Sequence, residues 1–397
     1  MSIEPIIHGV VAKNAHPLGC EKTVVQQIEY IKAHRTTQNV RRKKRVLLLG
    51  CSSGLGLAAR IALTFGDANA DTIGVSLDVA PGKNRSGNAG FYNNYFFKQY
   101  AEQSGHIAVN IQGDVFAKQT KEDVIEAIET YFEGEVDQII YSVAATKRIV
   151  GDKTYYSTIK PLKQPIQASF IDFANDTWVN QQVEPATDQE IEGTLKTMGG
   201  EDWQAWIDSL INAESIAHGC QTIAFSYIGA EITHPIYLDG TLGHAKVDLH
   251  QSSHSINREL ANFDGSAFAA VCQALVTRSS VVIPNLCPYV MALNQALTEQ
   301  GLFADPIQQM QRLFYTKLAK VHSPEVDSER LIRLDDNELN PEIQQQVSEC
   351  LQQMNKDNFT TFPAYQQLKK SFLQLNGFGW ELIDYSEEND YTSYLER

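Results

Sequence analysis

The segment RVLLLGCSSGLGLAARIALTF, residues 45–65, contains the strongest indication of the fold in this sequence. Its first part, RVLLLG, predicts a buried strand, and GLAARIALTF predicts a helix that follows a tight glycine turn. Three more strand candidates come next: DTIGVSL at 71–77, HIAVNI at 106–111 and DQIIYSV at 137–143. Their spacing of about thirty residues is the length of a β-α repeat. We therefore predict an α/β protein with a doubly wound parallel sheet covered by helices on both faces.

The remaining chain follows the pattern less regularly. TKEDVIEAIETYF at 120–132 predicts an amphipathic helix, which Thr120 and Asp123 open as a capping box. CQTIAFSYIG at 220–229 predicts another core strand, and GHAKVDLHQSSHSINRELANF at 243–263 predicts a long helix. Two polar helices are expected near the C-terminus, one opening at Asn340-Pro341.

No Ser/Gly-rich linker divides the chain, so we predict one enlarged Rossmann domain with two extensions. This domain covers residues 1–323, including an N-terminal segment at 1–44. A C-terminal extension, residues 324–397, is expected to pack on the same core.

Composition limits the class of protein. The 397 residues are 43% hydrophobic and 20% charged, which predicts a globular protein with a large core. A formal net charge of −15 argues against a protein that coats nucleic acid. Six scattered cysteines predict free thiols in a reducing cytoplasm. The uncharged stretch 279–298 contains Pro284 and Pro288, which suit a protein interior better than a membrane. We therefore expect a soluble cytoplasmic protein.

The turn from Gly50 to Gly56 has the spacing G-x-x-x-G-x-G. Glycines there let the backbone approach a pyrophosphate, whose charge then faces the N-terminus of the helix. This spacing is typical of short-chain dehydrogenases and reductases. The absence of a Lys-Ser/Thr pair after the last glycine argues against a P-loop. A purely structural glycine turn is the weaker alternative.

Residues after the next strands extend this dinucleotide hypothesis. Asp78 ends the second strand, where a carboxylate accepts hydrogen bonds from the adenosine ribose and repels a 2′-phosphate, so NADH is favoured over NADPH. An ordinary strand-end aspartate is the alternative. Asp114 follows the third strand as an adenine contact, and Val143 and Ala144 follow the fourth on the nicotinamide ribose side.

Short-chain reductases use a tyrosine and a lysine, but no convincing Tyr-x-x-x-Lys follows the fourth strand. Tyr237 and Lys246 are nine positions apart, which on one continuous helix would place them on opposite faces, about 180° apart. Pro235, just before Tyr237, and the intervening Gly240 and Gly243 instead indicate that Tyr237 lies on a loop and Lys246 early in the next helix. Spacing alone leaves a surface tyrosine and a solvated lysine open.

Long motifs decide between these interpretations. They are HPLGCE at 16–21, GCSSGLGLAARIA at 50–62, GFYNNYFF at 90–97, EPAT at 184–187, MGGEDWQAW at 198–206, SYIGAEITHPIYLDGTLGHAK at 226–246, RLDDNEL at 333–339 and NGFG at 376–379. Over nearly the whole chain the sequence closely resembles the family of NADH-dependent trans-2-enoyl-CoA reductases and V-type enoyl-[acyl-carrier-protein] reductases. The Tyr-x8-Lys spacing of Tyr237 and Lys246 is a hallmark of that family.

The resemblance implies roles for individual residues. Tyr237 matches the proton-donor tyrosine, Lys246 the lysine that holds the cofactor, and Tyr227 a second tyrosine that contacts substrate. The implied NADH contacts are Gly50, Cys51, Ser52, Ser53, Gly54, Leu55, Leu77, Asp78, Asp114, Val115, Val143, Ala144, Lys246, Leu275, Val276 and Thr277. It also implies a monomer with an enlarged substrate lid around residues 150–215, including the helices around Met198 to Trp206.

The implied reaction is the NADH-dependent reduction of the C2–C3 double bond of a trans-2-enoyl thioester, the final reductive step of fatty acid elongation. Acyl carrier protein and coenzyme A both stay open as the thiol, and no metal is expected. Two other functions remain as alternatives: a carbonyl-reducing short-chain dehydrogenase, and a dinucleotide-sensing protein without catalysis. The basic run from Arg41 to Arg45 is expected to be a solvated lead into the first strand, with docking of a coenzyme A phosphate or an acidic carrier protein as the alternative.

Overall fold

The computed structural model describes residues 4–9, 11–36, 42–83, 85–319, 324–381, 383–386 and 391–395. Its centre is a seven-stranded sheet in which every neighbouring pair is parallel. The strands, in spatial order, are β13 (Leu331–Arg333), β12 (Ser266–Val271), β11 (Ile216–Ser226), β6 (Val136–Tyr141), β3 (Arg45–Leu49), β4 (Asp71–Ser76) and β5 (Ala108–Gln112). Successive strands run outward from β3 in one direction and outward from β6 in the other. This order confirms the predicted doubly wound sheet.

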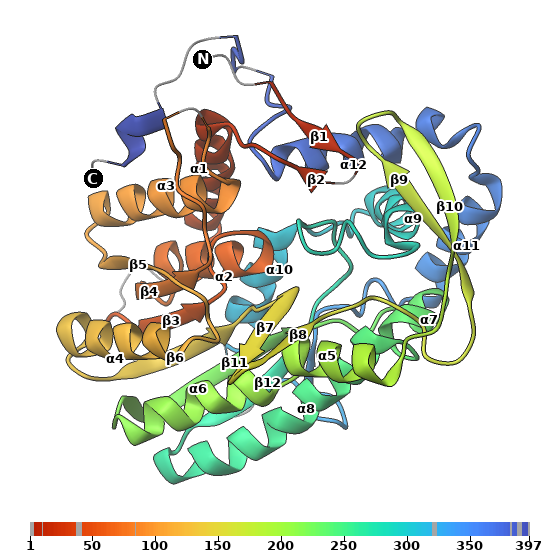
Figure 1. The fold of residues 1–397 in the computed structure, drawn as a ribbon. Helices are drawn as coiled ribbons and strands as arrows, with labels where there is room; N and C mark the ends of the chain where they lie inside the picture. The colour runs from red at the N-terminus through yellow and green to blue at the C-terminus, as the bar shows by residue number, and fades with distance from the viewer. Residues whose placement is uncertain are drawn as a thin grey trace.

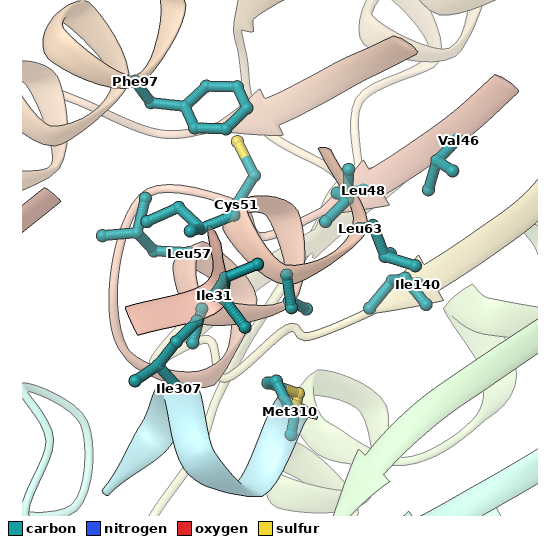
Figure 2. Packing of buried hydrophobic residues seen from close by; sticks show 14 of the residues in the cluster. Ile31, Val46, Leu48, Cys51, Leu57, Leu63, Phe97, Ile140, Ile307 and Met310 are labelled. Carbon is teal, nitrogen blue, oxygen red and sulfur yellow. The ribbon is translucent and has the colours of Figure 1, made fainter. Parts of the chain in front are cut away.

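Alternating side chains of the strands fix the two helical layers (Figure 1). Val46 and Leu48 point into one hydrophobic cluster, which contains the buried sides of α1 (Pro17–Ala33), α2 (Gly54–Phe65), α3 (Ala89–Gln103) and α10 (Pro306–Arg312). Leu47 and Leu49 point to the opposite face, against α4 (Lys118–Phe132), α6 (Glu201–Asn212) and α8 (Thr241–Leu260). Figure 2 shows the first cluster, where Leu63 of α2 lies beside Leu48 and Ile140 of the sheet.

A third hydrophobic cluster lies outside these two layers. Its helices are α7 (His234–Tyr237), α9 (Leu286–Glu299), α11 (Pro341–Gln353) and α12 (Pro363–Gln374). Helix α9 contains the uncharged residues up to 298, ends one residue later at Glu299, and is buried over most of its length, as predicted for a protein interior. Among the described residues no helix is both long and apolar enough to span a bilayer.

Between β6 and β11 the chain forms two antiparallel hairpins and two helices (Figure 1). The first hairpin pairs β7 (Lys147–Val150) with β8 (Lys153–Tyr156), and the second pairs β9 (Ile166–Asp172) with β10 (Thr177–Val183). Helix α5 (Asp188–Met198) follows and precedes α6. A short hairpin, β1 (Ile7–His8) with β2 (Val11–Ala12), lies near the N-terminus.

The capping box predicted at Thr120 is wrong. Helix α4 begins at Lys118, two residues earlier than expected, and no side chain caps it. Thr120 is buried inside the helix instead, where a Cβ on Gly113 would lie 2.5 Å from its hydroxyl oxygen. The Asn340 prediction is confirmed, because its side chain accepts a hydrogen bond from the Glu342 amide at the start of α11.

The basic run is solvated as predicted at Arg42 and Lys44, which are exposed, but not at its last residue. Arg45 is 9% exposed, and its guanidinium donates to both carboxylate oxygens of Asp137, at 3.0 and 2.9 Å. Arg41 lies outside the described residues. Arg45 therefore holds β3 against the start of β6 and is not free to bind a phosphate.

Candidate active site

The predicted site segments all follow strands of the parallel sheet. Gly50 to Leu55 follow β3, Leu77 and Asp78 follow β4, Asp114 and Val115 follow β5, Val143 and Ala144 follow β6, Tyr227 follows β11, and Leu275 to Thr277 follow β12. Because the carboxyl ends of parallel strands meet at one edge, the fold gathers these segments along that edge. The order of connection reverses between β3 and β6, the position at which doubly wound sheets open a crevice for ligands.

The glycine turn lies tightly against the end of β6. Gly50 has a positive φ of 87°, and a Cβ there would lie 2.1 Å from the Ser142 carbonyl oxygen. A Cβ on Gly56 would lie 1.9 Å from the Gly50 carbonyl oxygen. Any larger residue would therefore push the turn away from the sheet. Ser53 caps α2 without a side-chain hydrogen bond, so the first amides of α2 are available to an anion.

A cavity of about 630 Å³ opens over this turn. Five predicted cofactor residues line it: Ser52, Ser53, Leu77, Asp78 and Ala144. The opposite wall includes Thr146, Ser157, Ile159 and Met198 from the region between β6 and α6, and Phe372, Leu375 and Asn376 from the C-terminal extension. The lining does not include Asp114, Val115, Val143, Leu275, Val276, Thr277, Tyr227, Tyr237 or Lys246. Thr277 nevertheless adjoins the turn, because its Cγ2 would lie 3.5 Å from a Cβ on Gly54.

The predicted lid region contains both cavity wall and core. Met198 at the end of α5 lines the cavity. Trp203 and Trp206 of α6 are 0% exposed and pack on the face of the sheet with Leu47 and Leu49. The indole nitrogen of Trp206 donates to the carbonyl oxygen of Val115 at 3.1 Å. The two tryptophans therefore belong to the core.

Asp78 is held by a hydrogen-bond network that the sequence motifs did not predict. Ser76 Oγ and Asn94 Nδ2 donate to Oδ2 of Asp78 at 2.7 and 2.9 Å. The amide oxygen of Asn94 accepts in turn from Arg60 Nη1 at 3.1 Å, and Arg60 is completely buried. The network fixes the carboxylate beside the glycine turn. Asn94 lies in the GFYNNYFF motif, but no local pattern indicated that it contacts Asp78.

Tyr237 and Lys246 lie on two helices that meet at a glycine-rich turn. Tyr237 is the last residue of the single-turn helix α7, where the sequence predicted a loop, and Lys246 lies in the second turn of α8. A Cβ on Gly240 would lie 2.4 Å from the Ile236 carbonyl oxygen, and one on Gly243 would lie 2.2 Å from that of Leu238. These glycines allow α8 to pack directly on α7.

The surroundings of Tyr237 and Lys246 shift the pKa of both side chains. Tyr237 is 8% exposed, which excludes a surface tyrosine, and burial together with the nearby Glu338 carboxyl raises the pKa of its phenol well above the ordinary value. Burial lowers the pKa of Lys246 to about 8, and its Nζ donates to the Phe225 carbonyl oxygen at 3.3 Å. The phenol of Tyr237 is therefore protonated at neutral pH, and the amine of Lys246 still carries most of its charge there.

Tyr227 comes next to Tyr237 from the end of β11. The two rings meet edge to face, with centroids 4.5 Å apart and planes at 82°. The hydroxyl of Tyr227 donates to Glu338 Oε1 at 2.6 Å. The preceding residue, Ser226, lies 2.8 Å from Nε2 of His250, one turn after Lys246. Lys246 and His250 thus both hold the end of β11 that carries Tyr227.

The parallel sheet, the glycine turn opening α2 and the carboxylate after β4 define a Rossmann-type nucleotide-binding protein. The protein-family model described as the trans-2-enoyl-CoA reductase catalytic region matches residues 85–319 of the sequence. Two further models match residues 2–83, as the NAD(P)H binding domain of trans-2-enoyl-CoA reductase, and residues 326–388, as the enoyl reductase FAD binding domain. The chain belongs to the trans-2-enoyl-CoA reductase family.

Individual relatives agree over their full length. An enoyl-[acyl-carrier-protein] reductase [NADH] from Vibrio cholerae is 56% identical and matches 100% of both chains. A trans-2-enoyl-CoA reductase [NADH] from Clostridium beijerinckii is 41% identical over 98% of both chains. The crystal structure of Clostridium acetobutulicum trans-2-enoyl-CoA reductase in complex with NADH superposes with a TM-score of 0.94 at 36% identity, covering 100% of this chain and 99% of that one.

The description of residues 326–388 as FAD-binding does not fit the described residues of that segment. At the N-terminus of α11, Asn340 already accepts from the Glu342 amide, and the Glu342 carboxylate would repel a phosphate. The buried side chains Ile343, Val347 and Phe372 belong to the cluster with α9. This segment packs as core and supplies one wall of the cavity over the glycine turn, so we assign no step to a flavin.

Proposed function

We propose that this chain catalyses the NADH-dependent reduction of the C2–C3 double bond of trans-2-enoyl thioesters, giving saturated acyl thioesters. One observation carries the proposal. Strand β11 and the α7–α8 turn place the buried Tyr237 and Lys246 at the same edge of the sheet as the glycine turn. The names of the full-length relatives support the reaction and the cofactor. Both acyl carrier protein and coenzyme A are proposed as thiols, in the final reductive step of fatty acid elongation.

The residues around the turn fit a dinucleotide. Gly50, Cys51, Ser52, Ser53, Gly54 and Leu55 are proposed to hold the pyrophosphate, Leu77 and Asp78 the adenosine ribose, Asp114 and Val115 the adenine, and Val143, Ala144, Lys246, Leu275, Val276 and Thr277 the nicotinamide half. The cavity over Ser52, Ser53 and Asp78 and the close approach of Gly50 to Ser142 support this assignment. When bound, NADH supplies a hydride to C3 of the enoyl group.

The chain stabilises the charge that this transfer creates. As C3 gains hydride, negative charge moves to the thioester oxygen and forms an enolate. Tyr237 donates a hydrogen bond to that oxygen, and its raised pKa keeps the proton on the phenol until the charge develops. Lys246 adds positive charge from the neighbouring helix, and Tyr227 contacts the thioester beside Tyr237. The enolate then takes a proton derived from solvent at C2, which completes the saturated product.

We further propose the organisation of the whole molecule. The Rossmann domain covers residues 1–323, and the C-terminal extension covers residues 324–397. Within the predicted lid of 150–215, residues 150–198 are proposed to close over the acyl chain, because Ser157, Ile159 and Met198 lie in the cavity wall. The protein is proposed to be a cytoplasmic monomer. Size-exclusion chromatography with light scattering tests the oligomeric state.

One set of assays tests the reaction. Oxidation of NADH and of NADPH is measured side by side with crotonyl-CoA, dodecenoyl-CoA and a crotonyl-acyl-carrier-protein. We expect saturated acyl thioesters and faster turnover with NADH. Absence of NADH oxidation with every enoyl thioester would refute the proposal and favour a dinucleotide sensor. Reduction of ketones or aldehydes in place of the enoyl group would favour a carbonyl reductase.

A further inference from the structure

We propose that Glu338 is a positioning residue that controls where the phenol hydrogen of Tyr227 points. When Glu338 is protonated, the phenol hydrogen of Tyr227 is free to face the substrate. When Glu338 is ionised, its carboxylate accepts a hydrogen bond from Tyr227, so this hydrogen points away from the substrate. This inference rests on the proposed function, because it concerns the site in which Tyr227 contacts the thioester.

Both carboxyl oxygens of Glu338 accept hydrogen bonds within the protein. Its Oε1 accepts from the hydroxyl of Tyr227 at 2.6 Å and from the hydroxyl of Tyr289 at 2.7 Å. Its Oε2 accepts from the Ala274 amide at 2.7 Å. Gln344 donates to the Glu338 carbonyl oxygen at 2.6 Å and to the Tyr289 hydroxyl at 3.2 Å. Three elements therefore hold one carboxyl group against Tyr227.

The chemistry of this position is unusual for a structural residue. Glu338 is 0% exposed, and the charged or titratable groups that face it are Tyr227, Tyr237, Tyr289 and Asp335. None of them is a cation, and Asp335 already pairs with Arg333. A buried carboxylate without a cation is strongly unfavourable, whereas an apolar residue of similar size would fill the space. A carboxyl group that is buried without a cation beside a candidate active site indicates a functional role.

Two protonation states follow from this environment. Burial raises the pKa of Glu338 to about 7, so both states are populated near neutral pH. The ionised carboxylate can only accept, which directs the hydrogens of Tyr227 and Tyr289 towards it. The protonated carboxyl carries its own hydrogen and can donate it to a tyrosine oxygen, which releases the Tyr227 hydrogen. Tyr227 lies edge to face with Tyr237, so the released hydrogen is available beside the thioester.

Two variants separate this role from a structural one. In Glu338→Gln the amide NH₂ can donate to the tyrosine oxygens while its oxygen accepts from Ala274, which mimics the protonated carboxyl at every pH. In Glu338→Leu the pocket is filled but Tyr227 loses its partner. Tyr289→Phe is the matched control, because Tyr289 binds the same Oε1 atom but comes from α9.

The experiment measures kcat and KM for crotonyl-CoA with saturating NADH from about pH 5 to about pH 9 for each variant. We expect kcat/KM of the wild type to fall as pH rises through about 7. E338Q should lose this step and keep wild-type activity at low pH, while Y289F should retain the step. E338L should lower kcat about tenfold, and that loss should shrink to less than about twofold in a Y227F background, because residues acting through one another are not additive.

An E338Q profile with the same step as the wild type would overturn the inference, as would an equal E338L loss in both backgrounds. Circular dichroism melting of each variant shows whether it folds; if E338L does not, the E338Q pH profile alone decides. These outcomes differ from a failure of the proposed function, in which the wild type itself would reduce no enoyl thioester.

Discussion

A Cβ on Gly243 would lie 2.2 Å from the carbonyl oxygen of Leu238, closer than any real contact of that kind. The first turn of α8 therefore packs directly on the residue that follows Tyr237. Thr241 fixes the same turn from outside, because its amide donates to the Lys160 carbonyl oxygen at 3.0 Å. The nine-residue spacing of Tyr237 and Lys246 works in this fold because glycine permits that approach.

Gly243→Ala should separate α7 from α8 and misplace Tyr237. We expect kcat for crotonyl-CoA to fall at least about tenfold and the unfolding free energy to fall by about 1–3 kcal/mol, as for other overpacked sites. Denaturant unfolding and steady-state kinetics measure both. Gly82→Ala is the control, because its Cβ would meet only the flexible Arg85 side chain at 3.4 Å. Normal kcat in G243A would contradict this role.

Tyr237→Phe should remove most of the turnover while leaving NADH affinity within about twofold, since it deletes only a donor to charge formed in the transition state. Loss of one such donor lowers kcat by about 10²–10³. Fluorescence titration measures the Kd of NADH, and initial rates give kcat. A near-normal rate in Y237F would show that another group stabilises the enolate.

Lys246 should produce a second fall in the pH profile, more alkaline than the step assigned to Glu338 near pH 7. Its pKa is about 8 in the folded protein, so loss of its positive charge should lower kcat/KM as pH rises through that value. Stability should change in the opposite sense. Between about pH 8 and the ordinary lysine value of 10.5, the unfolded chain keeps a proton that the folded chain has lost. The unfolding free energy of the wild type should therefore rise across this window relative to Lys246→Met, and a flat difference would contradict the lowered pKa.

Asp78 should set the preference for NADH. Asp78→Asn keeps the shape of the side chain but removes the charge that repels a 2′-phosphate. We expect the ratio of kcat/KM for NADH over NADPH to fall about tenfold, equivalent to ~1.4 kcal/mol. Asp123→Asn, on the outer side of α4, is the control. An unchanged ratio in D78N would mean that other residues discriminate between the cofactors.

The central part of the fold could be predicted because its signals are local. Each strand from β3 to β6 is a short apolar run, and the intervening residues show helical periodicity. The hairpin β9–β10 was not predicted, because its pairing depends on contacts with α9 and α12 that are distant in sequence: Asn285 donates to the Gln167 carbonyl oxygen, and Tyr365 donates to Asp176. The capping box at Thr120 failed because packing against Gly113 placed that residue inside the helix.

In the candidate site, too, the sequence predicted the residues with local signals and missed those whose contacts are distant along the chain. The glycine turn and Asp78 follow strands, so position along the chain sufficed to identify them. The relation of Tyr237 to Lys246 required a close approach of two helices, which spacing alone does not encode. Glu338 is 111 residues from Tyr227, and a glutamate in a charged stretch gives no local sign that it is buried. Arg60 and Asn94 were missed for the same reason.

The most direct measurement of the proposed reaction uses NADH deuterated at its transferable position, with crotonyl-CoA in ordinary water. Mass spectrometry and NMR of the product locate the label. We predict butyryl-CoA with one deuterium at C3 and a solvent-derived hydrogen at C2, and almost no product from Y237F. Deuterium on the former carbonyl carbon, or no transfer from NADH to any enoyl thioester, would contradict the account.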